Sequence, residues 1–202
     1  MKTKETIAVI GATANAGYQI CRNLSVNGYR LLLMSQETEK LTSLKDEILS
    51  IRPEADIDIS ECEKTVSWES DIIILVNPND SEKDIADKIE QFATGKIVVS
   101  LTTPLQHHQT KSDLSSSTSF AERLQKRLPY SKIVAASNTA SSSDFITNTR
   151  SDMFIASNNG NSLEIVSKIL DTAGFNPVIV GDLSVCKTLE FMQPILQNRK
   201  FK

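Results

Sequence analysis

The sequence predicts an α/β protein with a doubly wound, mostly parallel sheet of about eight strands and helices on both faces. Short β-rich apolar runs alternate along the 202 residues with longer stretches of helical periodicity, which is typical of a parallel sheet wrapped by helices. Three of the runs, Ile7–Ile10, Ile72–Val76 and Ile97–Val99, are apolar throughout, as expected for strands covered on both faces. These three should therefore lie at the centre of the sheet. A turn rich in small residues follows the first run and leads into a helix.

The composition is that of an ordinary globular chain. Hydrophobic residues make up 40% of the sequence and charged residues 23%. The longest apolar run is far shorter than the roughly 20 residues that span a bilayer, and no signal-peptide core is evident near the start. A net charge of −3 provides no basic surplus for a phosphate backbone, which argues against nucleic acid as a partner. We expect one domain over residues 1–202, in a cytoplasmic protein with no membrane partner.

Eight segments have the length and residue types of strands, and the third of them carries the weakest pattern. They are Thr6–Gly11, Arg30–Ser35, Ala55–Ile59, Asp71–Asn77, Lys96–Leu101, Lys132–Ser137, Asp152–Ala156 and Pro177–Val180.

Six segments have helical periodicity. One opens near Asn15, and the others are Glu39–Leu49, Ser81–Phe92, Phe120–Leu128, Ser162–Ala173 and Val185–Leu196. Gly174 directly follows the fifth and is placed to cap its C-terminus. The last has an apolar stripe that either packs on the sheet or forms a homodimer contact. Its members are Val185, Leu189, Met192, Ile195 and Leu196.

Metal-ligating residues are few and badly spaced. Cys21, Cys62 and Cys186 are far apart and form no pair of the zinc-binding type. His107 and His108 are adjacent, so their side chains point in different directions. We therefore expect no metal site and no disulfide framework.

The turn after the first strand has the pattern Gly-x-x-Ala-x-x-Gly, from Gly11 to Gly17, and predicts the phosphate-binding turn of a Rossmann unit. Gly11 permits the tight turn, and Gly17 lets the helix pack close to the strand. Ala14 takes the place of the glycine that usually lets a pyrophosphate approach the backbone. The alternative is a former cofactor turn that survives only as a tight connection. The other candidate binding residues here are Ala12, Thr13, Asn15 and Ala16.

The end of the second strand bears on the choice of cofactor. An acid there binds the adenosine ribose of NAD, whereas an arginine accommodates the 2′-phosphate of NADP. Ser35 stands at this position, which favours NADP, but Gln36 is not arginine and Glu37 adds a repelling charge. Lys40, one helical turn later, offers a positive charge or is simply a solvated helix residue.

Several enzyme classes lack their motifs in this sequence. None of Tyr18, Tyr29 and Tyr130 is followed four residues later by lysine, so the short-chain dehydrogenase pair is absent. The sequence also contains neither a Gly-x-Ser-x-Gly nucleophile elbow nor a Gly-x-x-x-x-Gly-Lys phosphate loop.

Together these motifs resemble the coenzyme F420-dependent NADP oxidoreductases, a family that passes hydride between NADP(H) and a deazaflavin; a related reductase domain occurs in metalloreductases. The resemblance runs nearly end to end. The segments that carry it are Gly11–Gly17, Asp71–Pro78, Val98–Leu105, Ser119–Leu124, Leu128–Pro129, Ile133–Thr139, Phe154–Ala156, Gly174–Val178, Val180–Ser184 and Leu189–Glu190.

The resemblance implies a function and a set of site residues. It implies an NADP-dependent oxidoreductase, in which coenzyme F420 or a flavin serves as the small-molecule hydride acceptor, and a homodimer. By matching position it places Asn77, Pro78, Thr102, Pro104 and Asn138 near the nicotinamide, with Thr102 and Asn138 as the candidate catalytic residues.

Hydride transfer between stacked rings makes few demands on side chains, because the protein supplies mainly position and electrostatics. The sequence therefore also allows a non-catalytic NAD(P)-binding redox sensor. A further alternative is a small carbonyl or imine reductase that uses the long loop Thr102–Ser119 as a lid.

Overall fold

All eight predicted strands are present. The structure is a computed structural model that describes residues 4–76, 82–102, 118–138 and 150–190. Each strand begins and ends within one residue of its predicted bounds, including the weakly patterned third strand. The strands are β1 (Thr6–Ile10), β2 (Arg30–Met34), β3 (Asp56–Ser60), β4 (Ile72–Val76), β5 (Ile97–Thr102), β6 (Lys132–Asn138), β7 (Asp152–Ala156) and β8 (Asn176–Gly181).

The strands form one sheet in the order β3-β2-β1-β4-β5-β6-β7-β8. All neighbours are parallel except β6 and β7, which are antiparallel. The three strands that contain the wholly apolar runs, β1, β4 and β5, lie at the centre, as predicted, because central strands are covered on both faces. The chain winds outward in one direction from β1 to β3 and in the other from β4. The carboxyl ends of β1 and β4 therefore flank the switch point, where open α/β sheets bind ligands.

Six helices accompany the sheet in the described ranges. They are α1 (Asn15–Leu24), α2 (Thr38–Ile51), α3 (Glu63–Glu69), α4 (Glu82–Ala93), α6 (Phe120–Arg127) and α7 (Gly160–Thr172). Two 3-10 turns, η1 (Ser25–Asn27) and η2 (Leu183–Val185), complete the set. Residues 186–190 are helical, and the rest of the predicted last helix lies outside the described residues. None of the helices that the structure describes is long and apolar enough to cross a membrane.

Helix α3 is a correction to the sequence prediction, which has no helix between the third and fourth strands. It is only seven residues long and buries only Val66 and Ser67. A helix with so little apolar surface produces no periodic signal, and packing of Val66 on β1 and β2 supports it instead.

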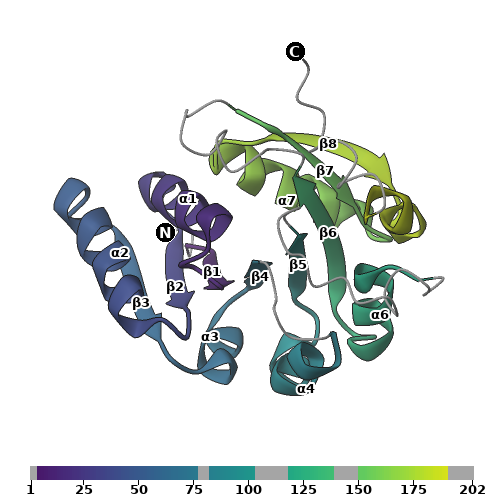
Figure 1. Cartoon of the computed structure of the whole chain (residues 1–202), viewed down its shortest axis with the longest axis horizontal. Helices are drawn as coiled ribbons and strands as arrows, with labels where there is room; N and C mark the ends of the chain where they lie inside the picture. Colours follow the sequence, from purple (N-terminus) through teal and green to yellow (C-terminus); the bar gives the residue numbers. More distant parts are fainter. Residues whose placement is uncertain (1–3, 77–81, 103–117, 139–149, 191–202) are drawn as a thin grey trace, which may run out of the picture.

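The sheet separates two layers of helices (Figure 1). Helices α1, α2 and α7 pack on one face, where β1 contributes Ile7 and Val9 to the larger core cluster. Helices α4 and α6 pack on the other face against Ile73 and Leu75 of β4. Side chains from the strands thus pack against a helix layer on each face of the sheet, which confirms the doubly wound class.

The predicted C-terminal cap of α7 is present. Gly174 has φ +89°, a conformation that only glycine adopts without strain. Its amide donates to the carbonyl of Asp171 (3.1 Å), and the amide of Phe175 donates to the carbonyl of Leu170 (3.0 Å). This is the Schellman arrangement, which satisfies the last carbonyls of the helix.

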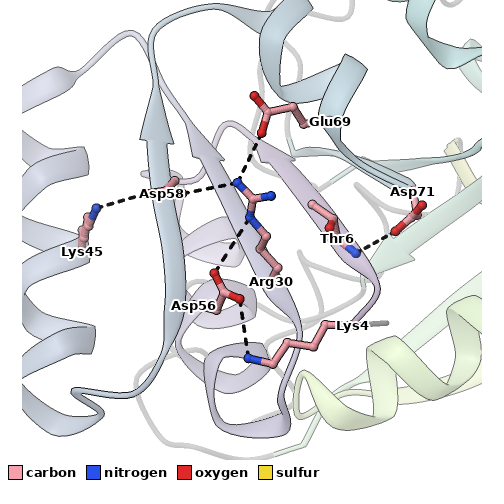
Figure 2. Close-up of polar contacts among 8 residues, drawn as sticks. All are labelled: Lys4, Thr6, Arg30, Lys45, Asp56, Asp58, Glu69 and Asp71. Carbon is pink, nitrogen blue, oxygen red and sulfur yellow. Dashed lines mark hydrogen bonds and ion pairs between the residues drawn. The ribbon is translucent and has the colours of Figure 1, made fainter. Parts of the chain in front are cut away.

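Charged side chains gather at the amino ends of β1, β2 and β3 (Figure 2). Arg30 lies at their centre and pairs with Asp56 (3.9 Å), Asp58 (3.5 Å) and Glu69 (3.3 Å). Lys4 and Lys45 pair with Asp56 and Asp58. Nearby, the Asp71 carboxylate accepts a hydrogen bond from the backbone amide of Thr6 (2.9 Å). This cluster lies at the edge of the sheet opposite the switch point.

Candidate cofactor-binding site

The turn after β1 is held tightly against its neighbours. Gly11 has φ +89°, and a Cβ on it would lie 2.4 Å from the carbonyl oxygen of Val76 at the end of β4. The amides of Gly11 and Ala12 both donate to the carbonyl of Met34, at 2.9 and 3.1 Å. The predicted role of Gly11 is therefore confirmed: only glycine provides both the backbone angle and the space.

Gly17 also has its predicted role. It lies in the first turn of α1 and is buried, and a Cβ on it would lie 2.5 Å from the carbonyl oxygen of Gly11 and 3.0 Å from the Cα of Ala12. The start of α1 can approach β1 this closely only because the side chain is absent. The first amides of α1, those of Asn15, Ala16 and Gly17, precede the first intrahelical bond, from Tyr18 to Ala14. Such amides, at the positive end of the helix dipole, suit a pyrophosphate.

Ala14 is the N-cap residue of α1. Its backbone is extended, with φ −70° and ψ 151°, so the position does not require glycine for its conformation. The side chain is partly buried and packs against the core cluster beneath α1. That the Ala14 methyl group hinders the approach of a pyrophosphate to the backbone stays a prediction.

A polar cluster lies where β2 ends, beside the turn. The Ser35 hydroxyl is 2.7 Å from that of Thr13, and it accepts the backbone amide of Glu37 at 3.2 Å. The Thr13 hydroxyl donates to the Glu37 carboxylate at 2.9 Å. Lys40 forms an ion pair with the other oxygen of that carboxylate. The structure thus brings Thr13 and Ser35 together, while the candidate residue Gln36, next to Ser35, is exposed.

A groove with a volume of about 380 Å³ adjoins this cluster and lies between α1 and α2. Its lining residues are Thr13, Tyr18, Glu39, Lys40, Ser43, Leu44 and Glu47. Tyr18 donates to Glu47, and Arg22 pairs with the same carboxylate at 3.4 Å. Burial raises the pKa of the Tyr18 hydroxyl, which keeps it protonated as the donor.

The candidate nicotinamide residues are placed only in part. Thr102 and Asn138 are the last residues of β5 and β6, and Thr102 pairs in register with Ser137. The two candidate catalytic residues therefore lie on neighbouring strands, at the same sheet edge as the turn. Asn77, Pro78 and Pro104 lie outside the described residues, as do His107 and His108.

A second polar cluster was not predicted from the sequence. A small cavity near the ends of β5 and β6 is lined by Ser100, Ser137, Cys186 and Glu190 among others. The Glu190 carboxylate accepts the backbone amide of Phe120, the first residue of α6, at 2.8 Å. Burial raises the pKa of this carboxyl. The contact joins residues 70 positions apart, so no local pattern could have indicated it.

Cys21, Cys62 and Cys186 are free thiols in different environments. Cys21 and Cys186 are buried, which raises the pKa of both thiols, that of Cys186 to about 12. Cys62 is exposed at the start of α3, and the Thr65 amide lowers the pKa of its thiol. Within the described residues, no group of three or more His, Cys, Asp or Glu side chains is arranged to hold a metal ion.

Comparison with known proteins points to one family. Residues 6–104 match the family described as NADP oxidoreductase, coenzyme F420-dependent. The chain is 24% identical to the F420-dependent NADP reductase of Methanothermobacter marburgensis, across 97% of this chain and 92% of the relative. It is 27% identical to the F420-dependent NADP reductase of Methanocaldococcus jannaschii, across 97% of this chain and 93% of the relative.

The fold is also similar to that of solved structures. A crystal structure from Arthrobacter sp. FB24, described as a candidate F420-dependent NADP reductase, has a TM-score of 0.69 and 17% identity to this chain. That likeness covers 94% of this chain and 90% of the other, so the two chains share a fold along nearly their whole length. The matched residues include both glycines of the turn and both strands that flank the switch point. Residues 6–104, just under half of the chain, thus match the family of coenzyme F420-dependent NADP oxidoreductases.

Proposed function

We propose that this protein is an oxidoreductase that transfers hydride between NADP(H) and coenzyme F420. The observation that carries the proposal is the turn between Gly11 and Gly17, where a side chain at either glycine would collide with backbone at 2.4–2.5 Å. A connection that served only to join β1 to α1 would not need two such positions at the switch point. The relatives named F420-dependent NADP reductase support the choice of the two ligands.

The residues present fit a dinucleotide. The amides of Asn15, Ala16 and Gly17 would hold the pyrophosphate, and the hydroxyls of Thr13 and Ser35 lie where the adenosine ribose would be held. When bound, the nicotinamide supplies the hydride-carrying carbon. The chain's own task is to hold the two rings in contact and to exclude water between them.

Thr102 and Asn138 are proposed to orient the nicotinamide and the acceptor. Their backbones end β5 and β6 beside the switch point, which supports this assignment. By family position, Asn77, Pro78 and Pro104 would complete the nicotinamide pocket. An ordinary flavin is the alternative acceptor, because hydride transfer between stacked rings makes few demands on side chains.

The assay that tests the proposal follows NADPH absorbance with purified protein and coenzyme F420. We expect steady oxidation with F420 and slower oxidation with FMN or FAD. Binding of NADPH without turnover on any acceptor would instead favour the redox-sensor alternative. Turnover confined to carbonyl or imine compounds would favour the reductase alternative.

We further propose that the protein is a single-domain, cytoplasmic homodimer. All eight strands join one sheet, which supports the single domain. Val185 and Leu189 of the predicted apolar stripe are only partly buried, which leaves surface for a second copy. The other members of the stripe, Met192, Ile195 and Leu196, lie outside the described residues. Light scattering at micromolar protein would test the dimer, and a mass near 22.3 kDa would refute it.

A further inference from the structure

Three residues beside the glycine turn form a closed ring of hydrogen bonds. The hydroxyls of Thr13 and Ser35 are 2.7 Å apart. The Thr13 hydroxyl donates to Glu37 Oε2 at 2.9 Å, and the Glu37 amide donates to the Ser35 hydroxyl at 3.2 Å. The ring joins the turn after β1 to the residues that follow β2.

Counting protons determines the direction of each bond. Each hydroxyl carries one hydrogen. The Thr13 hydroxyl donates its hydrogen to the Glu37 carboxylate, so the Ser35 hydroxyl must donate to the Thr13 oxygen. Both hydroxyl hydrogens are therefore consumed inside the ring. Neither hydroxyl can donate to a bound phosphate unless the ring opens.

The positive charge beside the ring is also engaged. Lys40 pairs with Oε1 of Glu37, the oxygen that Thr13 does not contact. The Lys40 ammonium and the Thr13 hydroxyl lower the pKa of the Glu37 carboxyl, so it stays ionised at neutral pH. Glu37 and Lys40 together contribute no net charge, whereas a 2′-phosphate site needs a positive one.

We propose that Glu37 weakens the discrimination between NADP(H) and NAD(H), because its carboxylate takes the hydroxyl and the ammonium that a 2′-phosphate would use. The inference rests on the proposed cofactor binding and deepens it. NADP(H) must displace the carboxylate from Thr13 and Lys40 and tolerate its negative charge. NAD(H) instead presents a ribose hydroxyl, which can donate to the same carboxylate without opening the ion pair. Glu37 thus weakens the preference for NADP(H) that Ser35 favours.

Glu37→Gln tests this in the full-length protein, because glutamine keeps the size and an acceptor oxygen for Thr13 but removes the charge. Dissociation constants for NADPH and NADH are measured by nicotinamide fluorescence. We expect the affinity for NADPH to rise by about tenfold or more, since like charges no longer meet. The affinity for NADH should stay the same or fall. Asp46→Asn is the matched control, since Asp46 is exposed further along α2 and its loss changes the net charge equally.

A second substitution separates the local effect from a general change of charge. Lys40→Gln should reduce NADPH affinity more in the Glu37→Gln background than in the wild type, because only there is the ammonium free. Equal gains for NADPH and NADH, or a gain matched by Asp46→Asn, would overturn the inference. So would an unchanged NADPH affinity in Glu37→Gln.

The same measurements keep this inference distinct from the proposed function. If the wild type binds NADPH and reduces F420 while Glu37→Gln changes neither affinity, the inference alone fails. If both proteins bind NADPH with the expected difference but no acceptor is reduced, the inference stands and the hydride-transfer proposal fails. If neither protein binds either nucleotide, both fail.

Discussion

A Cβ atom on Gly17 would lie 2.5 Å from the carbonyl oxygen of Gly11, closer than any side chain can approach backbone. The two glycines therefore make up one packing unit, in which helix α1 contacts the turn that leads into it. The proposed cofactor site depends on this contact, because it places the first amides of α1 over the carboxyl end of β1.

Gly17→Val should remove NADPH binding while the sheet still forms. The added side chain displaces the backbone of Gly11 and Ala12, which disturbs the turn before it disturbs the strands. We expect the affinity for NADPH to fall by about 100-fold or more, which corresponds to about 2.7 kcal/mol of binding free energy. Nicotinamide fluorescence measures binding, and circular dichroism measures folding. Gly160→Ala is the control, because a Cβ there meets nothing within 4 Å. Retained affinity in Gly17→Val would contradict the assigned role of the turn.

Arg30→Ala should destabilise the fold without affecting cofactor affinity. Arg30 lies among three carboxylates at the amino edge of the sheet, so its removal leaves their charges to repel one another (Figure 2). We expect a loss of about 1 kcal/mol in the free energy of unfolding, smaller in high salt. Urea denaturation measures it. Arg52→Ala, which loses a single pair with Glu54 at 3.8 Å, should cost less than about 0.5 kcal/mol. Equal losses in the two variants would show that the cluster contributes nothing as a network.

Glu190→Gln should stabilise the protein at neutral pH. Burial raises the pKa of Glu190 above its ordinary value of 4.5, so the folded state favours the protonated form. That stabilisation is complete below the unfolded pKa and is lost as the pH rises through the folded one. The neutral amide avoids the loss and can still accept the Phe120 amide. We expect the Tm of the variant to exceed that of the wild type by about 2 °C at pH 7, with the difference vanishing near pH 4.

Glu164→Gln, on the exposed side of α7, controls for the change in net charge. A Glu190→Gln protein less stable than the wild type at pH 7 would show that the charged carboxylate is needed.

Alkylation by iodoacetamide should modify Cys62 well before Cys21 and Cys186. Cys62 is exposed and its thiol has a lowered pKa, whereas burial protects the other two. Because ring-to-ring hydride transfer needs no thiol, the turnover of the alkylated protein should stay within about tenfold of that of the unmodified protein. Alanine variants of His107 and His108 should also keep turnover within about tenfold of the wild type. Mass spectrometry locates the label. A thousandfold loss in a histidine variant would indicate proton delivery in the slow step, and so the carbonyl or imine reductase alternative.

Asn138→Ala should reduce turnover more than it reduces NADPH affinity. Asn138 ends β6 at the switch-point edge, where an amide can orient the nicotinamide or the acceptor without holding the rest of the dinucleotide. Steady-state kinetics beside a binding titration separates the two effects. Equal changes in both would indicate that Asn138 only caps the turn that follows it.

Local sequence patterns predict the strands, most of the helices and the glycine turn. Apolar residues mark the strands, although in β3 they only alternate with polar ones. Gly11, Gly17 and Gly174 are recognisable because a turn or a helix end requires glycine there. Local signals failed at α3, which has too little apolar surface for a periodic pattern. They also failed to reveal the contact between Glu190 and Phe120.

The contacts between these elements follow from tertiary packing. The sequence shows that Ser35 is no acid and that Glu37 carries a charge, but it does not show where that charge points. The parallel pairing of β1 with β2 brings the turn beside the end of β2, so the Thr13 hydroxyl meets a carboxylate 24 residues away. Strand order and register produce that contact, since they depend on which apolar faces pack together across the whole sheet. The residues of a binding site at a sheet edge can therefore be predicted from the sequence. The contacts between their charged and polar side chains depend on how the strands pack.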